Sequence, residues 1–119
     1  MTILDTSALI RFFTKDIPSQ AKKVKDALEN EKDIKIPDVV FPELEYVLLG
    51  KTYNAERNKV LTAFKFLVSR KNIIVSPEVT IAVGIYEKTK LDIADCIILA
   101  NVHNGKLVSF DKKLRSIKI

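Results

Sequence analysis

Two patterns of hydrophobic and polar positions alternate along the chain. Short apolar runs, too brief for helices, indicate buried strands. These runs cover residues 2–4, 34–36, 73–75 and 107–110. Between them, apolar residues recur every three or four positions, the spacing of one helix face. The helices predicted in this way cover residues 8–13, 18–28, 41–49 (or 38–49), 55–68, 77–86 and 91–103, with a short basic helix after residue 111.

Short apolar strands that alternate with helices are typical of an α/β fold, in which helices connect parallel strands. We therefore expect a parallel sheet flanked by helices on both faces. No internal repeat or low-complexity linker interrupts the pattern. Because 119 residues is an ordinary length for one domain, we expect a single domain over residues 1–119.

The composition favours a globular protein of the cell interior. The hydrophobic share of 47% is ordinary for a globular chain. Cys96 is the single cysteine, so no disulfide can form within the chain. No apolar stretch approaches the roughly 18 residues of a membrane-spanning helix, and the first residues lack the features of a signal peptide. A cytoplasmic location is the expectation.

The chain is basic, with 20 Lys and Arg against 15 Asp and Glu and a net charge of +5. An excess of this size indicates affinity for polyanions such as nucleic acid. Most of the basic residues are lysines, which suit attraction to phosphates more than the reading of bases. Lys112, Lys113 and Arg115 could contact phosphate, although a solvated basic face explains them equally well.

Two aspartates directly follow predicted strands: Asp5 follows the run at 2–4, and Asp111 follows the run at 107–110. In open parallel sheets, ligands bind beyond the carboxyl ends of the strands. If these two strands lie side by side, both carboxylates project over the same edge of the sheet. Each aspartate could instead serve only as the N-cap of the helix that follows it.

Four further acids lie near predicted helix starts. Glu43 stands among apolar neighbours, and Asp95 follows Asp92 by three residues, which places both on one helix face. Asp92 is well explained as an N-cap, whereas Asp95, in an apolar stretch, should be partly buried and need a partner. Glu45 is an alternative to Glu43, but its displacement by two residues should point it elsewhere.

Several carboxylates without a His or Cys cluster form a hard oxygen site, which suits Mg²⁺ or Mn²⁺ better than Zn²⁺. Such ions can activate water and stabilise an in-line displacement at phosphorus. Without a metal, carboxylates this close would repel both one another and a phosphodiester. An acidic pocket with a basic surround favours a metal-dependent nuclease.

Four segments resemble, in order, the PIN-domain family, most closely its VapC-type ribonuclease toxins. The segments read LDTSALI, PELEYVL, LDIADCIILA and LVSFDKKL, and they span nearly the whole chain. The resemblance implies a parallel sheet of four or five strands and metal-dependent hydrolysis of RNA with Mg²⁺ or Mn²⁺. The acids that match the catalytic and metal-binding positions are Asp5, Glu43, Asp95 and Asp111. Residues that match supporting positions are Asp92, Ser109, Thr6 and Ser7.

The resemblance further implies a homodimer, an RNA substrate and a small VapB-type antitoxin that blocks the site. An alternative is a catalytically silent PIN-like module that binds RNA or protein. A phosphoryl-transfer protein with Asp5 as the acceptor is less well supported, because dehalogenase-like folds need a second Asp where Ser7 stands.

Overall fold

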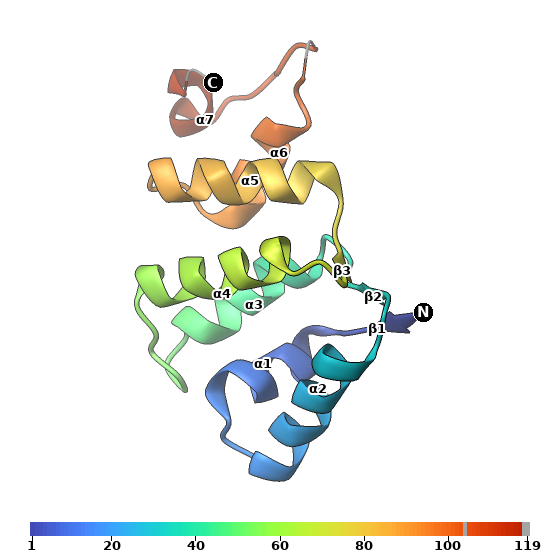
Figure 1. Ribbon diagram of the computed structural model, residues 1–119. Coiled ribbons are helices and arrows are strands. Elements are labelled where there is room, and N and C mark those ends of the chain that lie inside the picture. The colour runs from blue at the N-terminus through green and yellow to red at the C-terminus, as the bar shows by residue number, and fades with distance from the viewer. Residues whose placement is uncertain (104, 118–119) are drawn as a thin grey trace.

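The computed structural model describes residues 1–103 and 105–117 (Figure 1). The strands found there are β1 (Thr2–Ile3), β2 (Ile34–Lys35) and β3 (Ile73–Ile74). The helices found there are α1 (Thr6–Thr14), α2 (Pro18–Asn30), α3 (Val40–Leu49), α4 (Arg57–Ser69), α5 (Pro77–Lys88), α6 (Ile93–Ala100) and α7 (Lys112–Ser116).

The strands form one parallel sheet in the order β1-β2-β3, with Thr2 opposite Ile34 and Ile34 opposite Ile73. Helices flank this sheet, so the α/β class predicted from the alternating pattern is confirmed. Ile34 of the central strand is fully buried, as expected for an apolar strand residue between neighbours on both sides. Each strand is only two residues long, shorter than the apolar run that predicted it.

The sheet has three strands, so the prediction of four or five strands is wrong for the described residues. The run 107–110 is an irregular segment between α6 and α7. Val108 and Phe110 are 78% and 94% exposed, so no neighbour covers them. An apolar run becomes a strand only when its main chain pairs with another strand. This run stays apart from β1, whose outer edge therefore remains unpaired within the described residues.

Side chains at the boundary cap two of the helix starts. Asp5 caps α1, and Ser76 caps α5 by accepting a hydrogen bond from the Val79 amide at 3.1 Å, with Pro77 as the first helical residue. Both arrangements satisfy amides that a helix leaves free at its start. The side chain at the boundary therefore sets where each helix begins.

Two helix boundaries differ from the prediction. The helix predicted over 91–103 is shorter, because α6 ends at Ala100 and His103 has a left-handed backbone with φ of 49°. The helix predicted over 55–68 begins later, at Arg57, and Asn54 before it also has a left-handed backbone, with φ of 50°. Asparagine tolerates this conformation better than most residues, so it serves here as a turn residue.

The core centres on an aromatic stack that joins three helices. Phe64 of α4 lies between Phe41 of α3 and Tyr86 of α5, with ring centroids 5.4 and 5.3 Å apart. All three side chains are almost completely buried. Such contacts add to the stabilisation from apolar burial, so this stack fixes α3, α4 and α5 relative to one another.

The molecule is elongated, with extents of 45 × 32 × 18 Å and a radius of gyration of 15.0 Å. A compact domain of this length would have a radius of gyration of about 13.5 Å. Figure 1 shows the reason: α7 lies at the end of the molecule opposite to α1 and α2. Within residues 1–103 and 105–117, no helix is long and apolar enough to cross a membrane.

Candidate active site

Asp5 lies at the carboxyl end of β1 and begins α1. Its carboxylate accepts hydrogen bonds from the Ala8 amide at 3.0 Å and from the Ser7 hydroxyl at 2.8 Å. These donors stabilise the charged form and hold the pKa of Asp5 below its ordinary value. Asp5 is therefore an exposed anion at the edge where parallel α/β sheets bind ligands.

Glu43 lies in the first turn of α3, and its side chain faces α1. Its carboxylate accepts a hydrogen bond from the hydroxyl of Thr6, the residue that follows Asp5. The structure thus brings the segments of Glu43 and Asp5 together, although they are far apart in sequence. We call Asp5 and Glu43 the first acid group.

Asp92 and Asp95 stand together at the start of α6. Asp92 is the N-cap, and its carboxylate accepts from the Asp95 amide at 2.9 Å. Burial raises the pKa of Asp95 above its ordinary value, and the charges of Asp92 and Asp111 raise it further. Lys113 partly opposes this effect. Asp95 is therefore a half-buried acid among other acids, which a cation would stabilise.

Asp111 reaches this neighbourhood from α7. It is the N-cap of that helix and accepts from the Lys113 amide at 2.8 Å, while its own amide donates to the Ser109 hydroxyl at 3.0 Å. It does not follow a strand, contrary to the expectation from the run 107–110. We call Asp92, Asp95 and Asp111 the second acid group.

The predicted acids therefore occupy two groups instead of one pocket. Within residues 1–103 and 105–117, no three acidic, histidine or cysteine side chains gather closely enough to hold a metal ion. The donors have the hard oxygen chemistry that Mg²⁺ or Mn²⁺ requires, but their arrangement does not fit such an ion. Asp5 and Asp111 would project over one sheet edge if their strands lay side by side, and this condition is not met because segment 107–110 does not pair beside β1.

Two ionic residues outside the predicted set contact the start of α6. Glu45 is buried and faces the Ile93 amide, whereas Glu43 is exposed and faces Thr6. The expectation that Glu45 points elsewhere than Glu43 is therefore confirmed. Sequence reasoning missed Arg57, whose guanidinium donates to main-chain carbonyls that precede α6. No local pattern marks such a residue, because carbonyl acceptors have no sequence signature.

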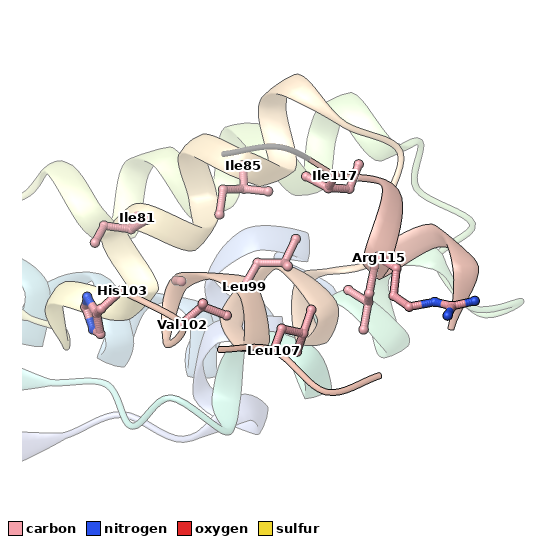
Figure 2. A pocket seen from close by; sticks show the side chains of 10 residues that line it. Ile81, Ile85, Leu99, Val102, His103, Leu107, Arg115 and Ile117 are labelled. Carbon is pink, nitrogen blue, oxygen red and sulfur yellow. The ribbon is translucent and has the colours of Figure 1, made fainter. Parts of the chain in front are cut away.

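A cavity of about 460 Å³ lies between α5, α6 and α7, and none of the predicted acids lines it (Figure 2). Most of its lining is aliphatic, including Ile85, Leu99 and Ile117. Its charged or titratable lining side chains, His103 and Arg115, supply no carboxylate. This cavity therefore does not contribute to either acid group.

Comparison with known protein families shows that the family model described as PIN domain matches residues 2–119. The match covers almost the whole chain and includes both acid groups. Comparison with curated proteins gives no match.

Proposed function

Because the chain belongs to the PIN-domain family, whose fold is nuclease-like, we propose that it is a metal-dependent endoribonuclease that hydrolyses RNA phosphodiester bonds. The observation that carries the proposal is the second acid group. Asp95 is half-buried, and its neighbours Asp92 and Asp111 add negative charge beside it. Carboxylates that are partly buried need partners, and a divalent cation beside Asp95 would offset the negative charge that surrounds it.

We assign Asp5, Glu43, Asp95 and Asp111 as the catalytic and metal-binding acids. Their oxygen donors suit Mg²⁺ or Mn²⁺, which would supply an activated water and stabilise charge at phosphorus. Supporting positions at which a hydroxyl or carboxylate contacts these acids or their helices are Thr6, Ser7, Asp92 and Ser109. One ion can contact both acid groups only if the groups approach each other.

Segment 107–110 offers a route for this approach. Its Val108 and Phe110 side chains are exposed, and the outer edge of β1 lacks a partner within the described residues. We propose that this segment pairs with β1 as a fourth strand in the active state. Pairing would cover the apolar side chains and carry Asp111 toward Asp5.

The proposed substrate is RNA, as the net charge of +5 favours. Beside Glu43, an open hollow is lined by Thr6, Pro42 and Tyr46, and Tyr46 is 82% exposed. An exposed aromatic ring near a phosphodiester-cleaving site can stack on an unpaired base. Tyr46 therefore supports a single-stranded segment of RNA as the substrate.

We also propose the biological setting that VapC-type proteins suggest. In this setting the chain is a cytoplasmic toxin, acts as a homodimer and is held inactive by a VapB-type antitoxin. The exposed apolar side chains of Val39, Tyr46 and Leu49, on or beside α3, support a partner near Glu43. Copurification of a small protein encoded beside this chain would test the pairing.

The direct test is cleavage of RNA by purified protein. Wild type should cut RNA with Mg²⁺ or Mn²⁺ and lose activity in chelator, whereas Asp5→Asn should be inactive in either metal. Asn retains the capping ability of Asp but loses its charge, so Asp5→Asn should still fold. Asp26→Asn, which removes an exposed carboxylate from α2, is the matched control and should cut normally.

Equal cleavage by folded Asp5→Asn and wild type would overturn the assignment. A second candidate function is a silent PIN-like module that binds RNA or protein. This alternative is favoured because, within residues 1–103 and 105–117, no three acidic, histidine or cysteine side chains gather closely enough to hold a metal ion. RNA binding without cleavage, in both metals and across several RNAs, would establish it.

A further inference from the structure

Another cavity, of about 580 Å³, is bounded by α1, by α4 and by the segment that connects α3 with α4. We call it the α4 cavity. The α4 residues that line it are Lys59, Thr62, Ala63 and Phe66, which recur at the three- and four-residue spacing of one helix face. Its volume is in the range of sites that bind small molecules, and none of the predicted acids lines it.

One wall of the α4 cavity is aromatic. The rings of Phe13, from α1, and Phe66, from α4, both line it and meet edge to face, with centroids 5.9 Å apart and planes at 85°. The Phe12 ring packs against Phe66 with centroids 5.5 Å apart, which helps to fix the orientation of Phe66. Edge-to-face and offset contacts between rings are favourable beyond the burial of apolar area. This wall therefore favours an aromatic ligand.

A second wall is the segment between α3 and α4, which hydrogen bonds hold in place. The Tyr53 hydroxyl donates to the Asp16 carboxylate at 2.6 Å and accepts from the Arg11 guanidinium at 3.3 Å. The Ala55 amide donates to the Leu48 carbonyl at 2.8 Å. Because these contacts tie the segment to the α1–α2 turn and to α3, the cavity is formed before any ligand enters. A preformed site saves the ordering cost of binding.

The charge of the lining is positive. Lys59 is the one charged side chain among the described residues that line the α4 cavity, and its ammonium group has no ion pair within residues 1–103 and 105–117. The hydroxyls of Thr14 and Thr62 donate to main-chain carbonyls of their own helices, at 2.7 and 2.9 Å. A ligand in this cavity therefore meets apolar surface and one cation, without a carboxylate that would repel an anion.

We propose that the α4 cavity binds a small aromatic carboxylate, with its ring against Phe13 and Phe66 and its carboxylate at Lys59. One lysine matches one negative charge. Because Lys59 is exposed, the carboxylate keeps its contact with water while the ring is buried, so the cost of desolvating the charge stays small. This inference does not rest on the proposed nuclease function, since no residue assigned to that function lines the cavity.

The test is a titration of the full chain with 2-naphthoate, followed by NMR of side-chain methyl groups. The methyl signals of Leu48, Ala55 and Ala63 should shift, with a dissociation constant of about 1 mM or lower for a ligand of this size. The signals of Leu99 and Leu107, which line the cavity between α5, α6 and α7, should stay unchanged. Binding of 2-naphthamide, which keeps the rings but lacks the charge, should be about threefold to fivefold weaker.

Lys59→Met tests the charge, with Lys22→Met as the matched control. Lys59→Met should weaken binding of 2-naphthoate by about threefold to fivefold and leave binding of 2-naphthamide unchanged. Lys22 is an exposed lysine of α2 that does not line the cavity, so Lys22→Met loses the same charge and should bind both compounds as wild type does. Equal weakening in the two variants would overturn the role of Lys59.

Thr62→Phe tests the location, because its ring would fill the cavity and should abolish binding. Thr62 is exposed, so the variant should fold, and the dispersion of its NMR signals checks this. Undiminished binding to folded Thr62→Phe, or shifts at Leu99 and Leu107 instead of Leu48, would overturn the proposal. Octanoate, with the same charge on an aliphatic chain, should bind more weakly, and equal binding would overturn the aromatic class.

Absence of binding to folded wild type, at 2-naphthoate concentrations well above the expected dissociation constant, would also overturn the proposal. Light scattering of wild type and Thr62→Phe then shows whether a second copy of the chain occupies the cavity instead. A wild-type dimer that this substitution dissociates, without binding of 2-naphthoate, would assign the α4 cavity to contact between copies and not to a small molecule.

Discussion

At the scale of single residues, several of the acids proposed for the site also stabilise the fold, because they cap helices. Asp5, Asp92 and Asp111 each accept a hydrogen bond from an amide at a helix start. Asp95 differs, because its surroundings oppose its charge instead of stabilising it. Substitutions should therefore have opposite effects on stability at Asp95 and at the capping aspartates.

Asp95→Asn should stabilise the metal-free protein at neutral pH. Burial, with the charges of Asp92 and Asp111, raises the pKa of Asp95 in the folded state. A raised pKa means that Asp95 favours folding below the unfolded-state pKa and loses this contribution as pH rises through the folded-state value. Melting temperatures in chelator should therefore be higher for Asp95→Asn at neutral pH and converge below pH 3.8. A lower melting temperature for this variant at neutral pH would contradict the prediction.

At the scale of elements, short local signals place the helices, and contacts between helices place the acids. Each acid of the second group is at or near the first turn of α6 or α7. Glu43 and Glu45 share α3 but face different segments. The position of an acid on its helix therefore decides which segment its carboxylate contacts, and this matters as much as the residue type.

The cap and the charge of Asp92 can be separated at the start of α6. Asp92→Ala should lower the free energy of unfolding by about 1 kcal/mol, because it removes the acceptor for the Asp95 amide. Asp92→Asn should retain most of that stability, since asparagine caps helices about as well. Urea denaturation of both variants measures the difference. Equal losses in the two variants would show that charge, not capping, dominates here.

At the scale of the whole molecule, α7, which Asp111 begins, lies at the end opposite to α1, which Asp5 begins. The radius of gyration of 15.0 Å exceeds the value of about 13.5 Å expected for a compact chain of this length. The unpaired edge of β1 and the exposed side chains of Val108 and Phe110 are consistent with this open shape. The proposed pairing of segment 107–110 with β1 would bring the two acid groups closer together and bury the side chains of Val108 and Phe110.

Divalent metal should therefore compact the protein. We expect Mg²⁺ or Mn²⁺ to lower the radius of gyration toward about 13.5 Å, as measured by small-angle X-ray scattering of monodisperse protein. Chelator should reverse the change, and Asp5→Asn should prevent it, because one group then lacks a ligand. Asp26→Asn should compact as wild type does. Compaction of Asp5→Asn to the same extent would argue against a site shared between the groups.

Much of the fold was predictable because its signals are local. Helix periodicity, the cap at Asp5 and the apolar runs that contain β1, β2 and β3 all depend on residues close together in the chain. The α/β class followed from their alternation. The opposite orientations of Glu43 and Glu45 also followed from helix geometry alone.

Only the tertiary structure decided which segments meet. Residues 107–110 have a strand sequence but no partner strand within the described residues, because pairing is a long-range contact that sequence pattern cannot supply. Because this segment does not pair with β1, Asp111 is not brought beside Asp5, and the acids stay in two groups. Arg57 donates a hydrogen bond to the Leu91 carbonyl, 34 residues away, and no local sequence pattern predicts this contact. The sequence by itself determined the helices, the segments that form β1, β2 and β3, and the kind of chemistry, because these depend on local pattern and residue type. Long-range packing determined which of these segments, and therefore which acids, come close together.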